Sequence, residues 1–105
     1  MKNDGKYFVR VEGNVLVYPD DIFPINHHNI KLFASQDGDE WSVTEQKTGY
    51  RIGNKCPTME EAIKSAEDTI GQKGINPTKK AIKEACQKCK EGLVYDAESK
   101  EWVTP

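Results

Sequence analysis

The chain of 105 residues is long enough for one compact domain and too short for two, so we expect residues 1–105 to form a single domain. Hydrophobic residues make up 36% and charged residues 30% of the chain, a balance that favours a folded protein and excludes a disordered one. The formal net charge of -2 argues against a general attraction to nucleic-acid phosphates.

The cysteine content and the hydropathy of the chain indicate the cellular compartment in which the protein is expected. The three cysteines, Cys56, Cys86 and Cys89, are an odd number, whereas small secreted domains usually carry an even disulfide framework. The N-terminal segment is too polar to be a signal-peptide core, and no stretch approaches the roughly 20 apolar residues that span a bilayer. We therefore expect a cytoplasmic protein with no membrane-spanning segment.

The first residues of the chain predict a β-hairpin. Residues 7–11 and 15–18 are rich in β-forming side chains, and they flank the turn sequence Glu12-Gly13-Asn14. Because both runs are apolar at nearly every position, we expect strands that are covered on both faces or share a buried edge.

A meander of three further strands is expected in the middle of the chain. Three segments have the composition of strands: residues 30–35, 41–45 and 50–53. Residues 41–45 alternate between apolar and polar side chains, as a half-buried strand does. Gly38 and Gly49 lie in the two intervening turns, where a left-handed backbone conformation suits glycine.

The first helix is predicted by a capping box and an apolar stripe. Thr58 precedes Glu61 by three residues, which is the spacing of a capping box, and glycines at positions 71 and 74 end the helix. The stripe consists of apolar residues at helical spacing: Met59, Ala62, Ile63, Ala66 and Ile70.

A second helix and a closing hairpin complete the predicted fold. Asn76 followed by Pro77 is typical of a helix start, Gly92 ends this helix, and residues 93–96 and 101–103 have the character of paired strands around Ala97-Glu98-Ser99-Lys100. The apolar face of this helix comprises five residues: Ala81, Ile82, Ala85, Cys86 and Cys89. We therefore predict an α+β fold, a curved antiparallel sheet of about five to seven strands packed on one face by two helices.

The charge is distributed unevenly along the chain. Residues 1–45 contain four basic and eight acidic residues, a formal charge of -4, whereas residues 71–92 contain six basic and two acidic residues, a formal charge of +4. The second helix is therefore a candidate docking face for an acidic partner, with Lys79, Lys80 and Lys83 as its binding residues. The alternative is a solvated helix face whose lysines complement the helix dipole.

Residues 19–29 form the second candidate binding segment. Two prolines and several Asn and Asp residues predict a long irregular connection, which contains the apolar residues Ile22, Phe23 and Ile25. These three side chains either tuck under the sheet or project as an anchor for a protein partner.

The sequence gives little support for catalysis, a metal or a cofactor. Cys86 and Cys89 form a C-x-x-C pair in the last turns of the second helix, where the dipole does not favour a thiolate, and they lie on its apolar stripe. A zinc site would need further ligands from Cys56, His27 and His28, so the alternative of small core cysteines is favoured. We find no nucleophile motif, phosphate-binding glycine loop or zinc-protease motif, and we expect no cofactor and no catalytic residues.

The predicted hairpin and helix in the middle of the chain are similar to segments of known proteins. The segment from Trp41 to Gly53, closed by a Thr48-Gly49 turn and followed by a helix from Thr58, resembles parts of small accessory proteins of bacteriophages and mobile elements. The resemblance spans residues 41–70 and carries over no catalytic residue. It implies a binding protein, such as an inhibitor of a host defence system.

These observations lead to three hypotheses of function. The first is a non-enzymatic protein-binding accessory module, a phage-type inhibitor or adaptor that occupies a surface on a larger protein. The second is a nucleic-acid-binding domain that lays its lysine-rich helix along phosphates and binds with a steep salt dependence. The third is a small ligand-binding protein or enzyme with a site at the open end of the sheet, near Tyr7, Trp41 or Tyr50.

Overall fold

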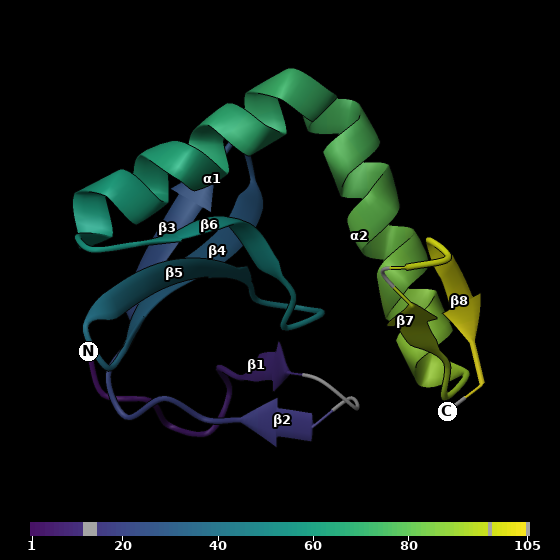
Figure 1. Cartoon of the computed structure of the whole chain (residues 1–105), viewed down its shortest axis with the longest axis horizontal. Helices are drawn as coiled ribbons and strands as arrows, with labels where there is room; N and C mark the ends of the chain where they lie inside the picture. The colour runs from purple at the N-terminus through teal and green to yellow at the C-terminus, as the bar shows by residue number, and fades with distance from the viewer. Residues whose placement is uncertain (12–14, 97, 105) are drawn as a thin grey trace.

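The computed structural model describes residues 1–11, 15–96 and 98–104, and it has an α+β fold with antiparallel sheets (Figure 1). The described residues form eight strands in three separate sheets, so the single sheet expected from the sequence is divided into a four-stranded sheet and two hairpins. The strands are β1 (Val9–Val11), β2 (Val15–Val17), β3 (Phe23–His27), β4 (Ile30–Asp37), β5 (Glu40–Glu45), β6 (Arg51–Cys56), β7 (Val94–Asp96) and β8 (Glu101–Val103). The helices are α1 (Met59–Lys73) and α2 (Ile75–Lys90).

The central sheet has the order β3-β4-β5-β6, and its strands β4, β5 and β6 confirm the predicted meander. Gly38 and Gly49 both have positive φ, 61° and 77°, as the two turns require. The register of β5 against β6 shifts between Trp41 and Val43, because the partners of these two residues, Cys56 and Ile52, lie four residues apart on β6.

The prediction of a long irregular connection over residues 19–29 is wrong, because Phe23–His27 is the edge strand β3 of the central sheet. Pro24 is compatible with an edge strand, where one side of the backbone needs no partner in the sheet. His28 and Asn29 both have positive φ, 51° and 68°, and they form the two-residue turn that connects β3 to β4. This geometry is the one that a tight hairpin favours.

Helix α1 covers one face of the central sheet (Figure 1). The predicted N-cap is present at its start, where the Glu61 backbone N–H donates to Thr58 Oγ1 at 3.2 Å, which is one of the two hydrogen bonds of a capping box. Ala62, Ala66 and Ile70 of α1 are buried against apolar side chains of the sheet. The two alanines allow a close approach between helix and sheet, because a larger side chain at either position would hold the backbones apart.

The opposite face of the sheet is covered by the N-terminal segment. Phe33 and Ile22 are fully buried there, and the ring of Tyr7 contacts the ring of Phe33 edge-on, with 5.3 Å between the centroids. The Asn3 side-chain amide donates to the carbonyl oxygens of Tyr7 and Pro19, each at 2.7 Å. These bonds hold the start of the chain against the segment that leads into β3.

Strands β1 and β2 confirm the predicted pairing but not the expected coverage. Val15 and Val17 are 55% and 46% exposed, and Val11 and Leu16 are exposed as well. The hairpin touches the main sheet mainly through Arg10, whose backbone N–H donates to the Gly49 carbonyl at 2.7 Å. The predicted turn at residues 12–14 lies outside the described residues.

Helix α2 diverges from the central sheet after a one-residue connection (Figure 1). Gly74, with φ of 98°, is both the C-cap of α1 and the N-cap of α2, so the N-cap of α2 lies two residues before the predicted cap, Asn76. Thr78 is the only buried residue of α2, so α1 supplies most of the helical cover of the sheet. Neither described helix combines the length and the apolar character that crossing a membrane requires.

The terminal hairpin β7-β8 confirms the predicted pairing and lies beside the last turns of α2 (Figure 1). Trp102 of β8 contacts Tyr95 of β7, with ring centroids 5.3 Å apart, and Tyr50, with centroids 6.1 Å apart. The Tyr50 contact joins the hairpin to the start of β6. Ala97, in the predicted turn, lies outside the described residues.

Candidate binding cleft

The space between α2 and the central sheet is incompletely filled and forms two adjoining cavities. The first, which we call the apolar pocket, has a volume of about 270 Å³ and lies between the end of α1, β6 and the first half of α2. The second, which we call the lysine groove, has a volume of about 820 Å³ and lies between α2 and the turns at the ends of β3 and β5. Glu45 and Ile82 line both cavities.

The apolar stripe of α2 forms one wall of this cleft. Its five predicted members are only partly buried, because α2 leaves the sheet at Gly74 and the sheet does not reach all of them. Ile82 packs against the core, whereas Ala81 and Ala85 face the apolar pocket and Cys86 faces the lysine groove. The stripe that the sequence assigns to the core is therefore a half-covered surface.

Five lysines surround the lysine groove, and all five are exposed. They come from three parts of the chain: Lys31 from β4, Lys47 from the turn after β5, and Lys79, Lys83 and Lys90 from α2. Apolar side chains of Ile30, Ile82 and Cys86 also line the groove. In the part of the chain that the structure describes, none of these five lysines forms an ion pair with a carboxylate, whereas Lys88 on the same helix pairs with Glu91 at 4.0 Å.

Among the described residues that line the lysine groove, the one carboxylate, that of Glu45, already has hydrogen-bond partners. Glu45 is 3% exposed, and its oxygens accept three hydrogen bonds of 2.8 Å, from the backbone N–H groups of Lys47 and Thr48 and from the Thr48 hydroxyl. This arrangement fixes the turn after β5 and places Lys47 at the edge of the groove. Sequence reasoning missed Glu45, because the side chains known to cap tight turns in this way are the shorter Asp, Asn, Ser and Thr.

The far end of the cleft is closed by an aromatic and cationic cluster. The Arg10 guanidinium lies 5.7 Å from the centre of the Tyr50 ring, and its Nε donates to the Thr48 carbonyl at 2.8 Å. Burial raises the pKa of the Tyr50 phenol above its ordinary value, and the nearby Cys89 raises it further, whereas Arg10 lowers it. Tyr50 is therefore a neutral phenol at physiological pH and contributes no charge to the cleft.

Cys86 presents its thiol on the wall of the lysine groove. Burial raises the pKa of Cys86 above its ordinary value, and the Glu45 carboxylate raises it further, against the smaller opposing effects of Lys47 and Lys90. Because the thiolate is the nucleophilic form, these effects disfavour catalysis by Cys86 near neutral pH.

A variant that retains Cys86 alone, Cys56→Ser/Cys89→Ser, should show this shift directly. We expect the rate of iodoacetamide alkylation to reach half its maximum at a higher pH in the folded protein than in the same protein unfolded in urea. The measurement is a series of alkylation time courses followed by mass spectrometry. An equal or lower midpoint in the folded protein would show that the groove does not suppress the thiolate.

Two of the three lysines that the sequence predicts as binding residues line the lysine groove, and the third does not. Lys79 and Lys83 line the groove together, one helical turn apart, whereas Lys80 is exposed outside its lining. Sequence reasoning did not include Lys31, Lys47 and Lys90 in the site. Lys31 and Lys47 are distant from α2 in the sequence, so only the fold brings them beside it.

The three predicted apolar binding residues do not form one anchor. Ile22 is fully buried under the sheet, and Ile25 packs against the core. Phe23 is 40% exposed, and its ring lies 5.7 Å from that of Trp41. Of the two outcomes weighed for this segment, tucking describes Ile22 and Ile25, and only Phe23 retains a large exposed surface.

The residues considered for zinc do not gather into one site. His27 Nδ1 lies 3.4 Å from a carboxylate oxygen of Glu67 on α1, and its ring contacts that of His28. Cys56, at the end of β6, packs against the core near α1, while Cys86 and Cys89 are on α2. Among the described residues, no group of three or more His, Cys, Asp and Glu side chains could hold a metal ion.

No protein-family model, curated protein or solved structure matches this chain. An assignment of function therefore rests on the geometry and chemistry of the cleft. Its two cavities differ in their lining, because five lysines surround one, whereas the surface of the other is mainly apolar.

Proposed function

We propose that this protein is a non-enzymatic protein-binding module that holds an acidic segment of a larger protein in the lysine groove. The observation that carries the proposal is the convergence of five lysines, from three separate parts of the chain, on one groove without an ion pair to a described carboxylate. The module acts as an inhibitor or adaptor, as the resemblance to phage accessory proteins implies.

Charge complementarity is the first support for an acidic partner. Five ammonium groups around one groove repel one another, and a positively lined groove concentrates anionic groups from solution. The Glu45 carboxylate is occupied by the turn that it caps. Carboxylates of a partner would thus supply the missing negative charge and relieve the repulsion between the lysines.

The lining of the groove favours a protein segment over a nucleic acid. Ile30, Ile82 and Cys86 present apolar surface between the lysines, and this surface suits an aliphatic side chain of an acidic peptide. No arginine and no aromatic residue is among the described groove residues, whereas nucleic-acid sites commonly use both to contact phosphates and stack on bases. The net charge of -2 also disfavours the nucleic-acid hypothesis.

The state of the cysteines is consistent with a cytoplasmic site of action, which is part of the proposal. Cys56, Cys86 and Cys89 are all free thiols. A reducing compartment would keep them so, and an oxidising one would expose three half-buried thiols to intermolecular disulfides.

A pair of charge-reversal variants tests the groove. Lys79→Glu/Lys83→Glu reverses two groove lysines, and Lys64→Glu/Lys80→Glu reverses two exposed helix lysines outside the groove lining. Both variants have a formal net charge of -6 in place of -2, so they differ only in where the charge is changed. We expect the groove variant to lose at least about tenfold in affinity for the partner and the control variant to retain it, since tenfold corresponds to about 1.4 kcal/mol.

The measurement combines capture with a direct titration. The wild-type protein and both variants are immobilised, exposed to lysate of the source cells with and without nuclease treatment, and compared by quantitative mass spectrometry. Each retained protein is then purified and titrated calorimetrically against all three chains. Equal affinity of the two variants would reject the groove as the docking face, and retention that disappears with nuclease would favour the nucleic-acid hypothesis.

A further inference from the structure

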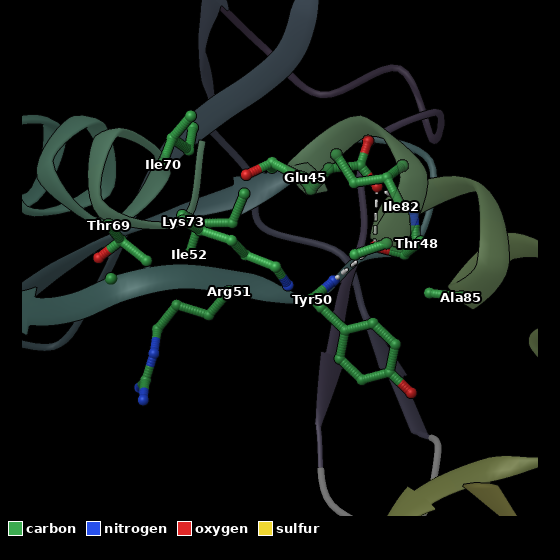
Figure 2. Close-up of a pocket in the computed structure, with 13 residues that line it drawn as sticks. Glu45, Thr48, Tyr50, Arg51, Ile52, Thr69, Ile70, Lys73, Ile82 and Ala85 are labelled. Atoms are coloured by element: carbon green, nitrogen blue, oxygen red, sulfur yellow. Dashed lines mark hydrogen bonds between the residues drawn. The ribbon is translucent and has the colours of Figure 1, made fainter. Parts of the chain in front are cut away.

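We propose that the apolar pocket is a second binding site, for a small carboxylic acid with an aliphatic or aromatic body. The proposal is independent of the protein partner in the lysine groove. It rests on the walls of the pocket and on one lysine that reaches into it (Figure 2).

Three structural elements supply apolar walls. Ile70 comes from α1, Ile52 from β6 and Ile82 from α2, and Ala81 and Ala85 add small apolar surface on the α2 side. The volume of about 270 Å³ lies just below the range of roughly 300–1,000 Å³ that is typical of small-molecule sites. A ligand with a short aliphatic chain or a single ring therefore matches the pocket better than a large cofactor.

The polar group that sets the ligand chemistry is Lys73, in the last turn of α1. Figure 2 shows its side chain reaching across the pocket toward Tyr50, while the guanidinium of Arg51 points away. Lys73 is in none of the ion pairs formed by the described residues. An apolar body in the pocket would place an anionic head beside this ammonium group, which is the arrangement that an amphipathic carboxylate provides.

The other polar side chains of the pocket are engaged elsewhere in the fold. The Thr78 hydroxyl donates to the Gly74 carbonyl at 2.7 Å, and the Thr48 hydroxyl donates to Glu45 at 2.8 Å. Glu45 retains its negative charge, but its oxygens accept hydrogen bonds from the turn after β5, at the boundary with the lysine groove. Lys73 is therefore the cation that reaches into the pocket and can favour an anionic ligand over a neutral one of the same shape.

The test uses three probes with the same eight-carbon chain and different heads: octanoate, 1-octanol and octylammonium. Each is titrated into the ¹⁵N-labelled full chain, and binding is followed by chemical-shift changes in two-dimensional NMR spectra. We expect octanoate to bind about tenfold more tightly than 1-octanol, because only the carboxylate gains a charge-assisted contact with Lys73. Octylammonium should bind more weakly than either. The shifts should fall on the residues that line the apolar pocket.

Two variants and a matched control assign the effect to the pocket. Lys73→Gln should remove the preference for octanoate over 1-octanol, whereas Lys64→Gln, an exposed lysine of the same helix outside the pocket lining, should keep it. Ala85→Leu adds volume to the wall and should weaken both probes at least tenfold while the dispersed NMR spectrum shows that the chain is folded.

Three results would overturn the proposal. They are equal affinities for octanoate and 1-octanol in the wild-type chain, an octanoate preference that survives Lys73→Gln, and shifts confined to the exposed β1-β2 hairpin. The Lys79→Glu/Lys83→Glu variant separates this site from the lysine groove, because octanoate should still bind to the apolar pocket of this variant. The same binding is expected even if the lysine groove has no acidic partner, so the two proposals can fail separately.

Discussion

Replacement of Gly53 by alanine should destabilise the folded chain by about 3 kcal/mol. Gly53 has φ of 80°, a left-handed conformation that costs an L-residue roughly 1–2 kcal/mol. A Cβ at this position would also lie 2.8 Å from the backbone nitrogen of Ala66 and 2.8 Å from the carbonyl carbon of Ser65. Since these atoms belong to the backbone of α1, the whole helix must shift, and overpacking of this kind costs about a further 1–3 kcal/mol.

Gly38→Ala is the matched control for this prediction. Gly38 also has positive φ, at 61°, but a Cβ there would meet nothing within 4 Å, so only the conformational cost of about 1–2 kcal/mol applies. Urea unfolding of the two variants and the wild type, followed by circular dichroism, gives the three free energies. If the two variants lose the same stability, close contact between β6 and α1 is not what requires glycine at position 53.

The second large effect is expected at Glu45. Glu45→Ala removes the acceptor of three hydrogen bonds and leaves two donors of the buried Thr48, its backbone N–H and its hydroxyl O–H, without an acceptor. Because each buried donor left unsatisfied costs about 1–3 kcal/mol, we expect a loss of about 3 kcal/mol in the free energy of unfolding. The turn after β5 should also loosen, so that the Thr48 amide exchanges with solvent at least tenfold faster than in the wild type.

Glu45→Gln tests whether the acceptor or the charge of Glu45 matters more. The amide oxygen of glutamine can still accept from the turn, so we expect this variant to lose less than half of what Glu45→Ala loses. Urea unfolding and amide hydrogen exchange measure the two effects. A wild-type exchange rate at Thr48 in Glu45→Ala would mean that the carboxylate does not hold the turn.

Local signals in the sequence predicted most of the secondary structure. The Thr58–Glu61 capping box and the stripe behind it give the start and the buried face of α1, because both depend on residues within one or two helical turns. Gly38 and Gly49 mark turns for the same reason, since each reports a backbone conformation at its own position.

Strand β3 shows how a strong local signal can mislead. Pro24 and Asn26 disfavour a strand when they are considered alone. However, every second residue of the segment, Phe23, Ile25 and His27, falls on the same face of a strand. Asn29 also suits the left-handed turn that follows. An edge strand tolerates proline because one side of its backbone needs no partner. The alternation and the turn together were the available evidence for β3.

The cleft could not be predicted from local patterns. Its shape depends on the direction in which α2 leaves Gly74, and its charge depends on the tertiary placement of Lys31 and Lys47 beside α2. The basic character of α2 was readable in the sequence. The half-covered state of its apolar stripe was not, because a stripe that is buried and one that lines a cavity have the same periodicity.

The order in which the strands pair determines which parts of the chain can fold while it is still being synthesised. Every named strand pairs only with its neighbours in sequence, and the four-stranded sheet and α1 are complete at Lys73. Contacts of such short sequence separation close quickly compared with the rate of about 5–20 residues per second at which a ribosome extends the chain. The sheet and α1 can therefore assemble while α2 is still being synthesised, and the cleft forms only after the sheet and both helices are in place.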